Sequence, residues 1–310
     1  HVSLITSNPA VSLDRAGKTI TLEDGTMVFY ERLLIATGAV PRRLALPGAD
    51  PKLVRYLRTF EDAMTLRNGI LPGKRIIIIG GGFIGLEVAS SARKRGAEVT
   101  LIEGLPRVLA RGVPEEIAAI VTKRHLAEGV DLRTATGITG FEETNGGIAV
   151  KLADASSIQG DLVLVGIGAV PVTALAEQAG LAIDNGIAVD DELRTSDPDI
   201  YAAGDCVSFP LSVYGGRRVR LESWRSAQDQ GEMAAANMLG KGLKLATVPW
   251  FWSDQYELTL QIAGLQDEAS ANVRRDLAGS AFIIFHMAAD GRLVAASGIG
   301  ISKSGFSGFG

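Results

Sequence analysis

Residues 74–103, KRIIIIGGGFIGLEVASSARKRGAEVTLIE, constrain the possible fold more than any other stretch of this chain. They open with an apolar, β-branched run at 76–79, which is typical of a strand buried on both faces of a parallel sheet. A glycine turn follows, then apolar residues at helical spacing up to Gly96, and then a second apolar run at 99–102 that ends on Glu103. This order predicts a strand–turn–helix–strand unit.

Three glycines in the turn, Gly80, Gly82 and Gly85, stand as G-x-G-x-x-G. We expect Gly80 to make the tight turn, Gly82 to let the backbone approach a pyrophosphate, and Gly85 to let the helix pack closely on the strand. The helix starts near Phe83 and Ile84 and offers free N–H groups to the phosphates. A plain strand-to-helix connection is the alternative, because glycine-rich turns are common. The complete order of elements favours a dinucleotide site.

The acid after the second strand bears on the choice of nucleotide. Glu103 lies about where a carboxylate accepts hydrogen bonds from a ribose diol, and it would repel a 2′-phosphate. No arginine follows it directly, although Arg107 is close in the chain and could swing in. We therefore expect NAD(H) rather than NADP(H).

Bulk composition excludes several classes of protein. A chain of 310 residues suits two or three domains, and a net charge of −4 without a dense basic run argues against nucleic-acid binding. The longest apolar stretch, 162–176, contains Pro171 and is too short to cross a bilayer. Cys206 is the one cysteine, which excludes an internal disulfide here, and three scattered histidines predict no metal site. We expect a cytoplasmic α/β enzyme.

The chain before the glycine turn is rich in short strands and turns. Residues 2–6 have the composition of a strand, and the Asp24-Gly25 pair between two alternating segments predicts a hairpin. An apolar strand at 32–36 leads to a proline-containing connector that begins at Pro41 and marks a domain boundary.

Helices are expected at 60–68 and from Pro114 to Gly129. His125, near the end of the second helix, is interpreted as a packing residue or a partner of the helix dipole rather than a catalytic base. Strands follow at 130–133, 140–143, 148–152 and 161–165. The last of these runs into the glycine turn GIG, and we take it as the end of the nicotinamide-binding domain and the return to the first domain.

Further along, a strand at 200–202 ends in Gly204-Asp205. A carboxylate at the end of a buried strand is suited to accept a hydroxyl hydrogen bond from a ligand, and a helix N-cap is the alternative interpretation. A helix is expected at 221–240, and an aromatic segment begins at 248. The tryptophans of this region either pack a small C-terminal domain or form a platform beside a flat cofactor.

Six motifs spread over nearly the whole chain agree with one another: ATGAVPR (36–42), GGGFIGLE (80–87), GIGAVP (166–171), TSDPDIYAAGDC (195–206), LESWRSAQDQ (221–230) and VPWFWSDQY (248–256). Together they resemble the FAD-dependent ferredoxin and rubredoxin reductases of bacterial oxygenase systems, within the pyridine nucleotide-disulfide oxidoreductase superfamily. The last motif is the specific one. Glutathione-reductase-like relatives carry a different C-terminal domain, and low-mass thioredoxin reductases carry a C-x-x-C that this chain lacks.

The resemblance implies that a hydride passes from NADH to FAD, and that electrons then leave singly to a small iron–sulfur protein, a ferredoxin or rubredoxin. The flavin carries this chemistry, so one cysteine suffices. Glu87, implied to lie near the nicotinamide carboxamide, and Glu222, implied to line the flavin ring, are the candidate catalytic residues. A favourable charge in the first helical turn is the alternative role of Glu87.

The resemblance also implies a set of FAD contacts. Asp205 would bind the ribityl chain with Gly204 beside it, and Thr37-Gly38 would run along the cofactor. The remaining implied cofactor-binding residues are Ser223 and Trp224 at the flavin ring, Trp250 and Trp252 flanking it, and Gly168 and Arg42 from the motifs above.

The implied fold is α/β, with two nested Rossmann-like dinucleotide-binding domains plus a small α+β C-terminal domain. Residues 1–39 and 162–244 would form the FAD-binding domain, 40–161 the NAD-binding domain, and 245–310 the C-terminal reductase domain. Members of the family begin with a strand–GxGxxG–helix unit for FAD and end in a helix, so we expect this chain to be part of a longer protein.

Two other functions stay open from the sequence. One is an NADH oxidase or another flavoprotein of the same superfamily, and the other is a non-catalytic module that retains only the NAD site. If the partner is an acidic ferredoxin, arginines near the flavin edge are candidates for docking, although such a cluster also fits a solvated face. These candidates are Arg217, Arg218, Arg220 and Arg225.

Overall fold

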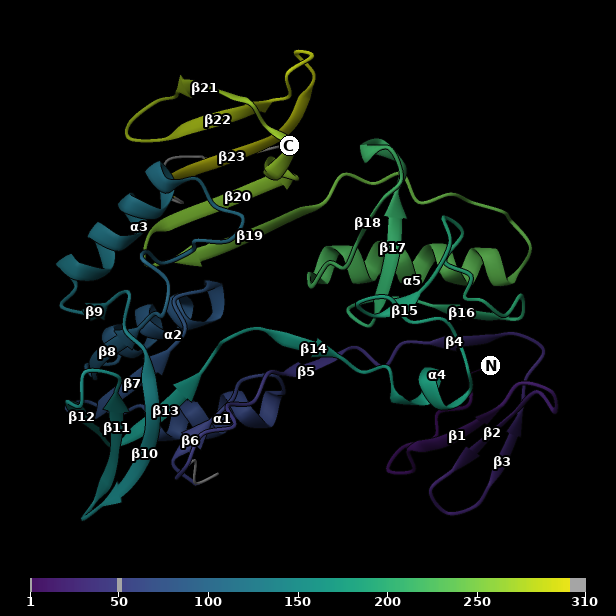
Figure 1. The fold of residues 1–310 in the computed structure, drawn as a ribbon, viewed down its shortest axis with the longest axis horizontal. Helices are drawn as coiled ribbons and strands as arrows, with labels where there is room; N and C mark the ends of the chain where they lie inside the picture. The colour runs from purple at the N-terminus through teal and green to yellow at the C-terminus, as the bar shows by residue number, and fades with distance from the viewer. Residues whose placement is uncertain (1, 49–51, 302–310) are drawn as a thin grey trace. The chain divides into compact units, whose positions relative to one another are not determined.

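The computed structural model describes residues 2–48 and 52–301 and divides the chain into two compact units (Figure 1). The first unit comprises His1–Val40 and Val170–Trp250, and the second comprises Pro41–Ala169 and Phe251–Gly310. Both combine helices and strands, so the expected α/β class is confirmed. Residues 302–310, where members of the family would continue into a last helix, lie outside the described residues.

A five-stranded parallel sheet in the order β6-β13-β7-β8-β9 forms the centre of the second unit. Helix α2 connects β7 to β8, helix α3 connects β8 to β9, and α1 precedes β7. The bounds are β6 (Val54–Arg55), α1 (Phe60–Gly69), β7 (Arg75–Ile79), α2 (Phe83–Lys94), β8 (Glu98–Ile102), α3 (Glu115–Ala127), β9 (Asp131–Arg133) and β13 (Leu162–Val165).

The central strand β7 is buried on both faces, as its sequence predicts. Ile76 and Ile78 lie in an apolar cluster with residues of α2 and α3. Ile77 and Ile79 lie in a second apolar cluster with residues of an antiparallel sheet. Burial of each such side chain contributes roughly 1.5–3 kcal/mol to the stability of the fold. That sheet consists of β10 (Ile138–Thr144), β11 (Gly147–Leu152) and β12 (Ser157–Gly160).

A second antiparallel sheet, in the order β19-β20-β23-β22-β21, covers the opposite side of the helices. Leu260, Phe282 and Ile299 of this sheet belong to the same apolar cluster as Ile76, so α2 and α3 lie between two sheets (Figure 1). Its elements are β19 (Trp250–Gln255), β20 (Leu258–Gly264), η2 (Gln266–Glu268), β21 (Ala271–Asp276), β22 (Phe282–Met287) and β23 (Leu293–Ile301).

The first unit combines a hairpin sheet, paired short strands and two helices. The Asp24-Gly25 turn joins β2 to β3 as predicted, with Asp24 Oδ1 accepting the Thr26 N–H at 2.8 Å. No strand occurs at residues 2–6, so that prediction was wrong. The elements are β1 (Ala10–Asp14), β2 (Thr19–Leu22), β3 (Met27–Phe29), β4 (Leu33–Ile35), α4 (Ala174–Gln178), β15 (Ile187–Ala188), β16 (Ile200–Ala202), β17 (Val207–Leu211), η1 (Ser212–Tyr214), β18 (Arg217–Val219) and α5 (Trp224–Met238).

Three boundaries differ from expectation. The units divide after Val40, Ala169 and Trp250 rather than after residues 39, 161 and 244, and the expected NAD-binding and C-terminal domains fall in one compact unit. Strand β13, expected to belong to the first domain, pairs in parallel with β7. The physical reason is that an apolar strand of four residues is stabilised where both of its faces are covered.

The first two boundaries lie within two short connecting strands, β5 (Ala39–Pro41) and β14 (Ala169–Pro171), which pair with each other.

In the described part of the chain, no helix combines the length and the apolar character that crossing a bilayer requires.

Two histidines of the second unit are buried, and they make stability depend on pH. Side chains of His125 and His286 are 0% and 2% exposed. Burial lowers the pKa of both below the ordinary 6.5. Unfolding returns each imidazole to that ordinary value, so below about pH 6.5 the unfolded chain binds more protons than the folded one.

We therefore expect the free energy of unfolding to fall as the pH drops through about 6.5. His286→Gln removes one of the two proton-linked contributions, so its unfolding free energy should change less steeply than that of the wild type over the same pH range. Urea denaturation at closely spaced pH values measures both slopes. Equal slopes in the two proteins would contradict the assignment of this pH dependence to buried neutral histidines.

Candidate nucleotide-binding site

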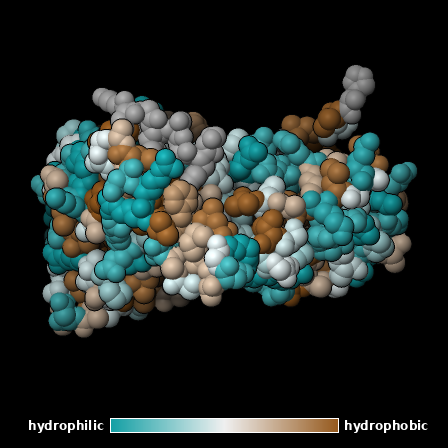
Figure 2. Space-filling model, turned by 90° about the horizontal axis from the view of Figure 1, so that it is seen from above, coloured by the Kyte–Doolittle hydropathy of each residue, from teal (hydrophilic) through white to brown (hydrophobic). Residues whose placement is uncertain are grey.

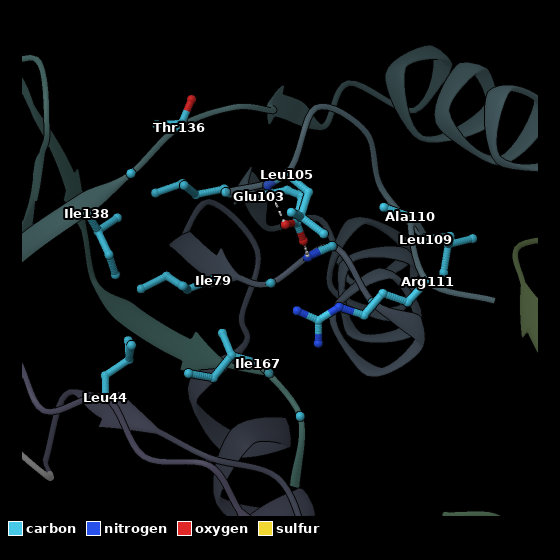
Figure 3. A pocket seen from close by; sticks show the side chains of 18 of the residues that line it. Leu44, Ile79, Glu103, Leu105, Leu109, Ala110, Arg111, Thr136, Ile138 and Ile167 are labelled. Atoms are coloured by element: carbon cyan, nitrogen blue, oxygen red, sulfur yellow. Dashed lines mark hydrogen bonds between the residues drawn. The ribbon is translucent and has the colours of Figure 1, made fainter. Parts of the chain in front are cut away.

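A cavity of 460 Å³ opens at the carboxyl ends of β7, β8 and β13 (Figure 3). Gly80, Gly82 and Phe83 line it from the turn after β7, Glu103 lines it from the end of β8, and Gly168 lines it from the turn after β13. Ligands of open α/β sheets bind at this edge. The structure thus brings together four residues that the sequence predicts for NAD(H), with Gly168, another predicted cofactor-binding residue.

The cavity has an apolar wall and a polar rim. Four aliphatic side chains that Figure 3 shows lying along one side are Leu44, Ile79, Ile138 and Ile167. Glu103 and Arg111 lie on the other side. An apolar wall suits a flat base, and a rim of charges and backbone N–H groups suits the sugar and phosphates.

Each glycine of the motif has a distinct steric reason. Gly80 has φ +110°, and a Cβ there would lie 2.3 Å from the carbonyl oxygen of Gly166. A Cβ on Gly85 would lie 2.0 Å from the carbonyl oxygen of Gly80, which shows how closely α2 approaches the end of β7. At Gly82 a Cβ would meet no protein atom within 4 Å. The space beside Gly82 is therefore available to a ligand.

The N-terminus of α2 supplies unsatisfied donors. Gly82 is the N-cap and provides no side chain to cap the helix. The first helical hydrogen bond runs from the Leu86 N–H to the Gly82 carbonyl at 3.1 Å, so the N–H groups of Phe83, Ile84 and Gly85 have no acceptor inside the helix. Ile84 and Gly85 do not line the cavity.

The Glu103 carboxylate is held by the turn that it faces. Its Oε2 accepts the Gly81 N–H at 2.6 Å, and its Oε1 accepts the Leu105 N–H at 2.7 Å (Figure 3). Each carboxylate oxygen has a further lone pair, so both remain able to accept a ribose hydroxyl. The backbone contacts fix the acid at the rim of the cavity.

The two arginines after Glu103 have different tasks. Arg107 donates to the carbonyl oxygens of Leu109 and Val113, both at 3.0 Å, and it does not line the cavity. It secures its own loop and is not placed to meet a 2′-phosphate. Arg111 does line the cavity, and Figure 3 shows its guanidinium extending into it. Sequence reasoning missed Arg111, because a loop arginine carries no signal of where it points.

Glu87 lies in the second turn of α2, outside the cavity lining. The alternative of a first-turn dipole contact is therefore wrong. Its Oε1 accepts a hydrogen bond from Ser253 Oγ at 2.5 Å. Burial raises the pKa of Glu87, and the Ser253 hydroxyl partly opposes this shift.

The aromatic motif of β19 splits into two faces, because side chains alternate along a strand. Ser253 and Gln255 are both 2% exposed. Phe251 meets Phe83 of α2 edge-on, with ring centroids 4.9 Å apart. Trp252, on the opposite face of the strand, is 43% exposed. Trp250 is half-buried at the start of the strand.

In the first unit, several FAD candidates form hydrogen-bonded turns. Thr37 Oγ1 donates to the Val172 carbonyl at 2.6 Å, and the Gly38 carbonyl accepts the Val172 N–H at 2.9 Å. The N–H of Gly204, which has φ +86°, donates to Gln230 Oε1 at 2.7 Å. In the second unit, the Arg42 N–H donates to the Gly168 carbonyl at 2.9 Å.

Asp205 occupies the turn between β16 and β17. A strand follows this turn, so the helix N-cap interpretation of Asp205 was wrong. The half-buried carboxylate stands at the carboxyl end of a buried strand, where the sequence predicted it.

At the start of α5, Ser223 caps the helix by accepting the Ser226 N–H at 3.3 Å. This cap explains why the helix begins at Trp224 rather than at Leu221. Trp224 is 69% exposed, and Glu222 forms an ion pair with Arg220. Hydrophobic residues, brown in Figure 2, interrupt the hydrophilic surface on the face seen there. An exposed large aromatic side chain suits contact with a flat ring.

Three of the four docking candidates, Arg218, Arg220 and Arg225, are engaged by residues of the first unit. Arg218 donates to the carbonyl oxygens of Val189 and Ser208 at 3.1 and 2.6 Å. Arg220 is bound to Glu222. Arg217 is exposed, and Arg225 forms only an i,i+4 pair with Asp229 while 52% of its side chain stays exposed.

These features fit the two nucleotides that the sequence implies. The open space at Gly82, the free N–H groups of α2 and the fixed Glu103 carboxylate suit NAD(H). The exposed Trp224 and the left-handed turn at Gly204 suit FAD.

Comparison with known proteins supports the same interpretation. Residues 1–231 match the pyridine nucleotide-disulphide oxidoreductase family, and residues 250–305 match the reductase C-terminal family. The chain is 40% identical to the ferredoxin–NAD(+) reductase component of an anthranilate 1,2-dioxygenase system from Burkholderia cepacia, covering 94% of this chain and 72% of that protein. It is 41% identical to a rubredoxin–NAD(+) reductase of Pseudomonas putida, covering 85% and 69%.

Solved structures agree with the sequence relatives. A ferredoxin reductase from Rhodopseudomonas palustris is similar with a TM-score of 0.90 and 39% identity, over 94% of this chain and 72% of that one. The reductase in a covalent putidaredoxin reductase–putidaredoxin complex is similar with a TM-score of 0.89 and 38% identity, over 94% and 71%. With the family match covering well over half of its length, this chain belongs to the pyridine nucleotide-disulphide oxidoreductases.

Proposed function

We propose that the protein takes electrons from NADH and delivers them through FAD, one at a time, to a small iron–sulfur protein of the ferredoxin or rubredoxin type. The observation that carries the proposal is the Gly82–Glu103 cradle, in a chain about 40% identical to reductases named for that reaction. FAD, when bound, accepts a hydride and releases single electrons.

The second unit would hold NADH. Gly80 and Gly82 form the turn, the N–H groups of Phe83, Ile84 and Gly85 receive the pyrophosphate, and Glu103 receives the ribose hydroxyls. Arg111 adds a positive charge at the rim, where it favours an anionic ligand. Glu87 is proposed to meet the carboxamide of the nicotinamide.

The first unit would hold FAD. Asp205 would accept a hydroxyl of the ribityl chain, Gly204 would allow close approach, and Thr37-Gly38 would run beside the cofactor. Glu222, Ser223 and Trp224 would line the flavin ring. Trp250, Trp252, Gly168 and Arg42 are proposed as further cofactor-binding residues. We also propose that the protein works in the cytoplasm, where NADH is supplied.

The test uses the whole protein purified with its flavin. We expect a yellow protein whose flavin colour bleaches faster with NADH than with NADPH, and which reduces cytochrome c only when an iron–sulfur carrier is added. A colourless protein that binds no flavin would overturn the proposal. Fast oxygen consumption without any carrier would favour an NADH oxidase instead, and NADH binding without flavin reduction would favour a nucleotide-binding module.

Two glycine substitutions separate nucleotide binding from folding. Gly82→Ala adds a Cβ that meets no protein atom within 4 Å, so the unfolding free energy should stay near wild type while NADH affinity falls at least about tenfold. Gly85→Ala drives a Cβ into the Gly80 carbonyl and should cost roughly 1–3 kcal/mol of stability. Calorimetric NADH titration and urea denaturation measure the two effects. Equal losses of stability in both variants would refute the assigned roles.

Docking of an acidic partner can be tested at Arg225. Arg225→Glu should lower carrier-dependent turnover, most strongly at low salt, while direct reduction of a dye by NADH stays intact. Arg292→Glu is the matched control, because Arg292 has a similar exposure, 54% against 52%, but lies in the turn between β22 and β23. A parallel fall in dye reduction, or an equal effect in the control, would show that Arg225 is not a docking residue.

A further inference from the structure

One edge of helix α2 is fitted to strand β19 and the turn after it. The contacting residues of α2 recur at helical spacing: Phe83, Glu87, Ser90 and Lys94. The Tyr256 N–H donates to Ser90 Oγ at 2.9 Å, and Lys94 Nζ donates to the Tyr256 carbonyl at 3.3 Å. The strand that carries the aromatic motif is thereby held in a fixed register on the helix that begins the nucleotide site.

A chain of hydrogen bonds runs inward from this contact to helix α3. Ser253 Oγ donates to Glu87 Oε1 at 2.5 Å, and Gln255 Nε2 donates to Ser253 Oγ at 3.1 Å. His125 Nε2 lies 2.9 Å from Gln255 Oε1. Ser253, Gln255 and His125 are all at most 2% exposed, so water does not compete for these bonds.

All the hydrogen bonds in this series are donated in the same direction. Gln255 presents its amide NH₂ to Ser253, so its carbonyl oxygen faces His125 and the imidazole must donate from Nε2. His125 Nδ1 is buried with no hydrogen-bond partner among the described residues, and a bare nitrogen is tolerated there better than an N–H. Every donor then points toward Glu87, where the chain ends on a carboxylate.

The other carboxylate oxygen is left for a ligand. In the part of the chain that the structure describes, no hydrogen bond is donated to Glu87 Oε2. Oε2 has no donor among the described residues and is not a buried atom, so it still reaches solvent. Glu87 therefore has one oxygen fixed by the protein and one oxygen open.

We propose that Ser253, Gln255 and His125 are positioning residues that orient the Glu87 carboxylate so that Oε2 can accept a hydrogen bond from the nicotinamide carboxamide. This inference rests on the proposed function, which puts the nicotinamide at Glu87. The C-terminal sheet would then help to recognise the nucleotide, in addition to packing against the helices.

The charged groups around the chain favour this arrangement. Asp254, on the neighbouring position of β19, adds to burial in raising the pKa of Glu87. On α3, burial and the adjacent Arg124 lower the pKa of His125, and the hydrogen bond to Gln255 partly opposes this shift. Arg124 is itself paired with Glu257 at 2.7 Å and with Glu128. Lys94 of α2 lies over the Tyr256 ring, beyond the end of the chain of bonds. The Ser253 hydroxyl is thus the main group that favours the ionised form of Glu87.

The test is to replace Ser253 by alanine and follow the ionisation of Glu87 directly. Infrared absorption of the protonated carboxyl group, assigned by its loss in Glu87→Gln, is recorded across pH on the purified protein. Ser253→Ala should move the midpoint upward by about one pH unit, because a hydrogen bond to a charged group is lost. Gln255→Met should give a smaller upward shift, because the serine hydroxyl is then less polarised.

The matched control is Ser297→Ala. Ser297 is likewise fully buried and bonded to a histidine, with its Oγ 2.9 Å from His286 Nε2, but it has no link to Glu87. The control should leave the midpoint of Glu87 unchanged. Calorimetric NAD⁺ titrations over the same pH range should show the pH dependence of affinity moving with the midpoint in Ser253→Ala.

An unmoved midpoint in Ser253→Ala, or an equal shift in Ser297→Ala, would overturn the positioning role. A shifted midpoint with wild-type NAD⁺ affinity at every pH would overturn the link to the nicotinamide. Failure of the proposed function is seen separately, since it would leave the wild-type flavin unreduced by NADH whatever the ionisation of Glu87.

Discussion

The approach of helix α2 to the end of β7 is the constraint on which the second unit depends. Gly85 has no side chain, and a Cβ there would lie only 2.0 Å from the Gly80 carbonyl oxygen. The glycine therefore allows α2 to start close to the end of β7. This places three unsatisfied N–H groups at the sheet edge. Helix α2 also packs into the apolar cluster that extends from β7 to the C-terminal sheet.

Helix α2 also connects the nucleotide cavity to the C-terminal sheet. Phe83 lines the cavity and also meets Phe251, while Glu87 meets Ser253 one turn later. Helix α2 therefore contacts strand β19 and also lines the nucleotide cavity. Because β19 alternates, fixing Ser253 and Gln255 inward necessarily turns Trp252 outward. The two faces of this motif therefore lie in different environments, one buried and one exposed.

Much of the fold and part of the site could be predicted from local sequence. The β7–α2–β8 unit, the Asp24-Gly25 hairpin and the buried strand at 162–165 follow from periodicity and turn chemistry, which act over a few residues. Residues 2–6 form no strand, because an apolar sequence needs a partner strand and the described residues give it none. The sequence did not indicate Gln255 as the hydrogen-bond partner of His125, since Gln255 lies 130 positions away in the sequence.

By itself, the sequence determined the nucleotide turn, the acid at its rim and the family, because each depends on residue type at short spacing. Only the tertiary structure decided that Arg111 rather than Arg107 enters the cavity, that β13 completes the nucleotide sheet, and that Glu87 is bonded to the C-terminal sheet. These contacts join segments far apart in the chain. Their geometry is set by how helices and sheets pack, which no local pattern encodes.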